Sequence, residues 1–305
     1  MKTAGIVILV VIILGIAIFV IKSRKSIAKE QRQNYCINIF MPLTENKDFN
    51  PQDLMNSFKQ MWGMDIVCAQ PTGENSEKGA AKKYMVGNGP DKNNLFITWA
   101  RDPLKKEMIE LLVKSSEAGF TNNEPISKDD VISLRNHKAY FQIEYILGPT
   151  AAKERVLFTA KLLLTLNKMY SACGFVNASA QSYIPSARIG TDLFKNKDLP
   201  ISDVFLLFVN IQMVSDGQQI ELHTHGMDQF WLPDIKMQFS DKNNFNSNYD
   251  VIRNAAVYMI EKGHAMNISD TASLAEDGKI FKVTEVKEER DHPFGYYGVI
   301  GLKRQ

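Results

Sequence analysis

Glu221, His223 and His225 stand at alternate positions of a segment that the sequence predicts to be a β-strand. Side chains two positions apart in a strand lie on the same face of the sheet. The three residues could therefore offer one carboxylate and two imidazoles to a single ion, and these donor types suit zinc. They are our candidate metal ligands, and a divalent metal ion is the one cofactor that the sequence suggests.

A second interpretation of this strand needs no metal. The same alternation describes an amphipathic strand whose polar residues face water while Leu222 and Thr224 turn into the core. No third histidine or cysteine is tied to His223 and His225 by its spacing. A metal-dependent enzyme that uses Glu221, His223 and His225 is therefore the alternative hypothesis rather than the main one.

Phe230 and Trp231 are the candidate partner-binding residues. They begin the apolar stretch Phe230-Trp231-Leu232-Pro233, which follows the three candidate metal ligands. If this stretch is buried it fills a core, and if it is exposed its aromatic side chains would form a docking anchor for another protein. We expect a protein partner, whose identity the sequence leaves open.

Signatures of the common enzyme classes are absent from the sequence. It contains no Walker loop, no G-x-G-x-x-G, no H-E-x-x-H and no G-x-S-x-G. Gly87-Asn88-Gly89 lacks the lysine and the following helix of a phosphate-binding loop, so we interpret it as a turn. The sequence favours a non-catalytic role and leaves the question of an enzyme open.

Residues 4–21 form an apolar run without a charge or a proline. As a helix this run is about 27 Å long, close to the hydrocarbon thickness of a bilayer. A secretory signal peptide would have an apolar region of roughly 7–15 residues and a small-residue cleavage site. The run is longer and ends in Ile18-Phe19-Val20-Ile21-Lys22, so we predict a single transmembrane helix.

The charges that flank the apolar run predict its orientation. Only Lys2 precedes the run, whereas five basic residues follow it within residues 22–32. Basic residues stay on the cytoplasmic side, so we expect a single-pass protein of the inner membrane whose large domain is cytoplasmic. Residues 1–34 would then be the anchor and a basic juxtamembrane stalk, with the lipid bilayer as a binding partner of residues 4–21.

The rest of the chain is mildly acidic. The net charge of the chain is +2, and residues 1–35 contain six basic residues and one acidic residue, which leaves −3 for the remainder. Nucleic-acid binding needs a basic surface, so we expect no nucleic-acid partner. Cys36, Cys68 and Cys173 are widely spaced, which indicates buried reduced thiols rather than a disulfide framework or a thiolate zinc site.

The order of predicted elements indicates an α+β fold. Apolar residues make up 45% of the chain, enough to bury a core. Strands come in pairs interrupted by single helices, which favours a mostly antiparallel sheet with helices packed on one face. Residues 35–305 would form this domain, with an internal seam near residue 148. We predict strands at 35–42, 65–69, 82–86, 95–99, 140–147, 175–178, 204–214, 219–224, 232–239, 271–275, 279–286 and 296–302. We predict helices at 51–62, 104–118, from 127, 151–171 and 249–261. Asn50 should cap the helix that begins at Pro51, and Ser127, with Asp130 at the third position, should cap the helix that follows it.

Several of these segments resemble an uncharacterised bacterial family, the domain of unknown function 4261. The similar segments are Phe96-Ile97-Thr98-Trp99, the break at Gly148-Pro149-Thr150, Thr224-His225-Gly226-Met227 and Phe230-Trp231-Leu232-Pro233-Asp234-Ile235. The resemblance would cover nearly all of residues 36–303. The family has no assigned activity and therefore supplies no catalytic residues, and its pattern does not call for His223 or His225. With the anchor, these observations predict a membrane-anchored cytoplasmic domain that acts as a non-catalytic protein-binding or regulatory module.

Overall fold

The structure is a computed structural model of the chain, and it describes residues 37–70, 81–89, 94–117, 126–147, 150–189, 197–274, 278–286 and 297–305. The predicted anchor, residues 4–21, lies outside these ranges. None of the helices in the described ranges is both long and apolar enough to cross a membrane. The membrane helix therefore stays a prediction.

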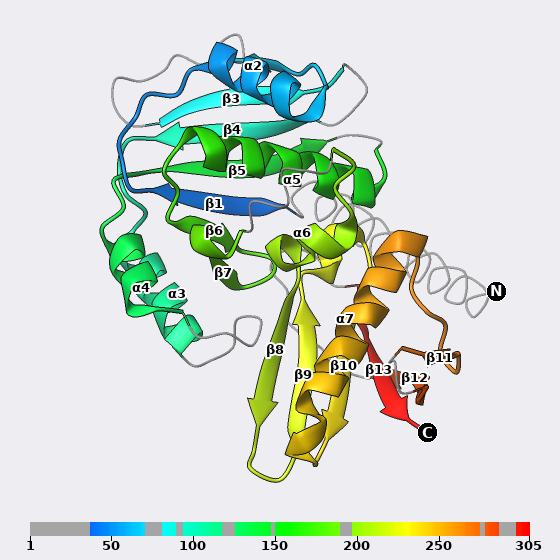
Figure 1. Cartoon of the computed structure of the whole chain (residues 1–305). Helices are drawn as coiled ribbons and strands as arrows, with labels where there is room; N and C mark the ends of the chain where they lie inside the picture. The colour runs from blue at the N-terminus through cyan, green and yellow to red at the C-terminus, as the bar shows by residue number, and fades with distance from the viewer. Residues whose placement is uncertain are drawn as a thin grey trace, which may run out of the picture.

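The described residues form an α+β fold with two sheets, which we call sheet A and sheet B (Figure 1). Sheet A has the strand order β2-β3-β4-β5-β1-β6-β7, and all its neighbouring strands are antiparallel. The α+β class and the largely antiparallel pairing are confirmed, whereas the expectation of a single sheet is wrong. The strands of sheet A are β1 (Asn38–Leu43), β2 (Val67–Ala69), β3 (Ala81–Gly87), β4 (Asn94–Ala100), β5 (Ala139–Leu147), β6 (Gly174–Asn177) and β7 (Ser182–Pro185).

Helices cover both faces of sheet A. In β1, Ile39 and Met41 belong to the large core that α2 (Pro51–Trp62) and α5 (Ala152–Met169) help to form. Phe40 lies between them and packs against a smaller cluster with α3 (Lys106–Glu117) and α4 (Lys128–Arg135). Successive strand residues face opposite ways, so α3 and α4 lie on the face opposite α2 and α5. The prediction that helices pack on one face is thus wrong for sheet A.

Two helix starts that the sequence encodes locally are confirmed. The Asn50 side chain accepts a hydrogen bond from the Gln52 N–H at 2.9 Å, and Pro51 is the first residue of α2. Ser127 and Asp130 form a reciprocal capping box at the start of α4. Both motifs satisfy backbone N–H groups that have no partner inside the helix. Short polar side chains are favoured at these positions for this reason.

Sheet B has the strand order β11-β12-β13-β10-β9-β8. Its pairs are antiparallel except β10 with β13, which run parallel. Helix α7 (Phe245–Lys262) lies against one face of this sheet, as Figure 1 shows. The strands are β8 (Asn210–Ser215), β9 (Ile220–His225), β10 (Asp234–Phe239), β11 (Thr271–Ser273), β12 (Ile280–Val286) and β13 (Val299–Arg304).

The segment predicted as one strand at 204–214 is instead a helix followed by a strand. Helix α6 (Ile201–Phe208) ends just before β8 begins. Val204, Phe205 and Phe208 are all fully buried between other elements. A run that is apolar at almost every position shows neither helical nor strand periodicity, so the sequence could not separate the two.

The two sheets share one hydrophobic core. It contains Ile39 of sheet A, Phe205 of α6, Leu222 and Ile235 of sheet B, and Val251 of α7. The division into residues 1–34 and 35–305 stays a prediction, and residue 148, the expected seam, lies outside the described ranges.

Candidate functional site

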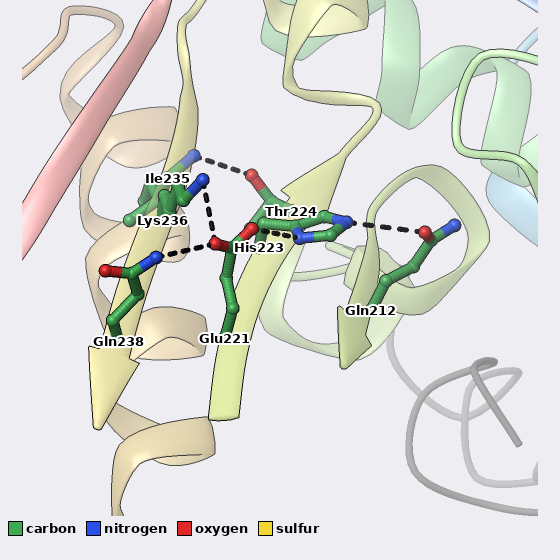
Figure 2. Close-up of polar contacts among 7 residues, drawn as sticks. All are labelled: Gln212, Glu221, His223, Thr224, Ile235, Lys236 and Gln238. Atoms are coloured by element: carbon green, nitrogen blue, oxygen red, sulfur yellow. Dashed lines mark hydrogen bonds and ion pairs between the residues drawn. The ribbon is translucent and has the colours of Figure 1, made fainter. Parts of the chain in front are cut away.

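A row of side chains runs across the face of sheet B that lies opposite α7. Leu222 and Ile235 point into the core beside α7, so their strand neighbours point the other way. On that side Gln212 of β8, His223 of β9 and Lys236 of β10 are cross-strand partners. Figure 2 shows these side chains with Glu221, all on the same side of the strands.

Glu221 is the centre of this network. One carboxylate oxygen accepts hydrogen bonds from Lys236 Nζ at 2.8 Å and Gln238 Nε2 at 2.9 Å, and the other lies 3.2 Å from His223 Nδ1. Burial disfavours the charged form, but the hydrogen bonds from Lys236 and Gln238 and the nearby charges of Lys236 and His223 outweigh it. The pKa of Glu221 is therefore lowered, and the carboxylate is ionised at neutral pH.

His223 and His225 are buried, each with 7% of its surface exposed. Their rings meet edge to face with centroids 4.8 Å apart, and His223 Nε2 lies 3.4 Å from Gln212 Oε1. Leu222 and Thr224 turn inward, as the amphipathic interpretation predicts. Its prediction that His223 and His225 face the solvent is wrong, because both are buried. The Glu221 carboxylate holds one nitrogen of His223 and so fixes the orientation of the ring.

The structure gives the predicted metal ligands only part of a metal site. Glu221 and both histidines lie close together, yet in the described ranges no three His, Cys, Asp or Glu side chains are placed to hold a metal ion. Lys236 occupies one oxygen of Glu221. A cation bound there would have to displace this ammonium, since the two positive charges would repel each other at close range.

A pocket of about 740 Å³ adjoins the network on the same face of the sheet. Lys236 and Gln238, which both hold Glu221, form part of its wall. Gly301 of β13 lies in its floor, between Lys236 and Thr284 in the strand register. Sequence reasoning did not predict this pocket, because its residues come together only through the register of β10, β13 and β12. It is lined by Gln219, Lys236, Gln238, Phe239, Ser240, Thr284, Glu285, Val286, Gly301, Leu302 and Lys303.

Phe230 does not form an exposed docking anchor. It is buried, and its ring packs edge to face against Phe208 at a centroid distance of 6.3 Å. Trp231 is half-buried, and its ring lies 4.1 Å from the guanidinium carbon of Arg155. The same guanidinium carbon lies 4.7 Å from the ring centroid of Tyr145. The two predicted partner-binding residues thus contribute to the packing between α5 and the turn after β9.

That turn contains two buried polar side chains, Gln229, which sequence reasoning did not single out, and Asp228, which could have joined the candidate metal ligands. In the 3-10 helix η3 (Met227–Phe230), the Gln229 amide donates to Phe208 O at 2.6 Å and accepts from Asn177 Nδ2 at 3.1 Å. Asp228 is buried beside Asp234, and desolvation, followed by the charge of Asp234, raises its pKa well above the ordinary value. Asp228 therefore keeps its proton at a higher pH than an exposed aspartate does.

The cysteines offer no reactive thiol among the described residues. Cys68 and Cys173 are buried and form no disulfide, as predicted, while Cys36 lies outside the described ranges. Burial raises the pKa of Cys68 to about 12 and also raises that of Cys173. Both remain thiols at neutral pH and are poor nucleophiles.

Comparison with known proteins links the chain to one family model. Searches of curated proteins and of solved structures found no match. The predicted resemblance, which extended over residues 36–303, is confirmed over a shorter stretch that begins at His223 and includes β10, α7, β11 and β12. Residues 223–294 match the family described as Domain of unknown function (DUF4261).

Proposed function

We propose that this chain is a membrane-anchored, non-catalytic binding or regulatory module. The observation that carries the proposal is the polar face of sheet B opposite α7. Helix α7 fills one face of the sheet, while the other presents the Glu221 network and a pocket of about 740 Å³. Pockets of this volume that are lined by both polar and apolar groups are typical of ligand-binding sites.

The state of the polar groups supports binding rather than catalysis. Glu221 is ionised but already paired with Lys236, so it is a poor general base. The described thiols are buried with raised pKa values. The alternative is a metal-dependent enzyme built on Glu221, His223 and His225, and the pairing of Glu221 with Lys236 weighs against it.

The anchor in this proposal is the apolar run at residues 4–21, and the module faces the cytoplasm because the basic residues follow the run. A reporter enzyme that is active only in the cytoplasm, fused after Gln305, should be active and should sediment with the membranes. A reporter that is active only outside the cytoplasm is the matched control and should be silent. The opposite pattern of activities would contradict the orientation, and a reporter in the soluble fraction would contradict the anchor.

Val214 allows a test of the binding face. It lies directly opposite Glu221 in the strand register and is 52% exposed, outside the pocket. A charge here should repel an apolar contact, so Val214→Glu should reduce partner capture from detergent-solubilised membranes at least tenfold, the equivalent of about 1.4 kcal/mol. Capture is measured by quantitative mass spectrometry after chemical cross-linking.

The matched control is Val67→Glu, because Val67 is also an exposed strand valine but lies in sheet A. This variant should capture the partner as the wild type does. Equal loss in both variants would exclude sheet B as the specific surface. Metal analysis of the same preparations tests the alternative, since a stoichiometric transition metal that is lost in His223→Ala would support the enzyme.

A further inference from the structure

Three lysines lie in or beside the pocket of sheet B. Lys236 and Lys303 line it, and Lys282 is the cross-strand partner of Lys303. Lys236, Gly301 and Thr284 form one row across β10, β13 and β12. Lys303 lies two positions after Gly301 in β13, and Lys282 lies two positions before Thr284 in β12. Their side chains therefore share the face of that row.

The Lys282–Lys303 pair has an energetic cost. Directly opposed residues in an antiparallel pair have Cβ atoms about 4.5–5.5 Å apart, and like charges at this distance destabilise the sheet. Both lysines are exposed, so water and salt weaken this repulsion, although the cross-strand distance is shorter than the screening length. A negative group bound between or beside the ammonium groups would relieve it, and this makes the pair a favourable place for an anion.

Gly301 keeps the floor of the pocket open beside these charges. A Cβ added to Gly301 would lie 2.3 Å from Thr284 Oγ1 and 3.1 Å from Val286 Cγ2. The Thr284 side chain therefore lies over the glycine, where any larger residue would displace it. The Thr284 hydroxyl and the ammonium groups of the lysines can all donate hydrogen bonds to an oxyanion.

We propose that this pocket binds a small polar molecule through an oxyanion group, a phosphate or a carboxylate. Lys303 supplies positive charge and Thr284 supplies a hydroxyl, while Lys236 adds a charge that it shares with Glu221. The carboxylate of Glu285 also lines the pocket and offsets part of this positive charge. This inference deepens the proposed function, because it rests on the same face of sheet B and names the class of ligand that the module senses.

Lys236 gives the bound anion a route to the Glu221 network. Its ammonium lies 2.8 Å from Glu221 Oε2 and also lines the pocket. An anion in the pocket competes with Glu221 for this charge, and Glu221 in turn holds His223. Substitution of Lys236 would disturb all these contacts, so Lys303, which lines the pocket and is exposed, is the better residue to change.

The test uses the full chain in non-ionic detergent, with inorganic phosphate and succinate as probes at ionic strength matched with sodium chloride. A ligand that binds only the native state raises the melting temperature by mass action. At least one probe should raise it above the chloride reference, and Lys303→Gln should weaken that apparent affinity roughly tenfold, the usual effect of losing one charged hydrogen bond.

Lys106→Gln is the matched control, because Lys106 is an exposed lysine on α3, a helix that packs against α4 and β7 of sheet A. It should leave the response unchanged. Without a probe, Lys303→Gln should melt no lower than the wild type, because it removes the opposed charges; a merely structural lysine would lower the melting temperature.

Response to phosphate alone or to succinate alone identifies the oxyanion. No response to either probe, or equal responses in the wild type and Lys303→Gln, would overturn the inference. Val214→Glu lies outside the pocket and should retain anion binding. The response to anions can therefore be absent while partner capture is present, and the reverse is also possible. Each result tests its own proposal and leaves the other to be decided by its own experiment.

Discussion

Gly226→Ala should destabilise the domain by several kcal/mol. Gly226 follows β9 with φ 105°, a conformation that costs a residue with a side chain about 1–2 kcal/mol. An added Cβ would also lie 2.1 Å from Phe208 O and 2.9 Å from Gln229 Nε2. It would thus intrude on the hydrogen bond that these two atoms form, and overpacking of a tight site adds about 1–3 kcal/mol. The full chain in detergent should show this as a lower melting temperature by circular dichroism.

Gly217→Ala separates the two causes. Gly217 also has a positive φ, 92°, but an added Cβ there meets nothing within 4 Å. Its replacement should cost only the conformational part, about 1–2 kcal/mol. If both variants melt at the same temperature, the close approach of Gly226 to Phe208 O has no energetic role, and the turn is less tightly packed than the structure indicates.

Arg155→Ala should cost about 2–5 kcal/mol, the range for removing a large side chain from a core. Only 1% of Arg155 is exposed, and its guanidinium contacts the rings of both Tyr145 and Trp231. The residue therefore ties α5 and β5 to the turn between β9 and β10. Thermal unfolding should report the loss, and tryptophan fluorescence should change because the cation leaves the Trp231 ring.

Arg101→Ala is the control for the cation–π contact itself. The guanidinium of Arg101 lies 5.2 Å from the Trp99 ring centroid and 2.6 Å from Asp48 Oδ1, but it is exposed. Exposed contacts of either kind contribute about 0–1 kcal/mol. If Arg101→Ala and Arg155→Ala lower the free energy of unfolding by similar amounts, burial does not strengthen the cation–π contact of Arg155.

A structural feature could be predicted from the sequence when the residues that produce it lie close together in the chain. The Asn50 cap and the Ser127 capping box are formed by residues two or three positions apart, and both were predicted. The inward direction of Leu222 follows from alternation within one strand. The helix at Ile201–Phe208 was missed because its exposed position 206 is also an apolar leucine, so residues 204–209 form an unbroken apolar run without helical periodicity.

The candidate site shows the same division. Glu221 and His223 were predicted to share a face, and they do. Lys236 and Thr284 could not be added, because they join the site through the pairing of β9, β10, β13 and β12. The burial of Phe230 likewise depends on Phe208, which comes from a helix that was predicted as a strand.

The position of β13 has a consequence for the order in which the protein folds. This strand follows every other strand of sheet B in the chain, yet it lies between β10 and β12 and forms the floor of the pocket. During synthesis, β8, β9 and β10 can pair as soon as they leave the ribosome, but the pocket must wait for residues 299–304. Until then β10 has an unpaired edge, which is a template for wrong association. Nascent chains that stall before Val299 should therefore be the species that chaperones and proteases recognise.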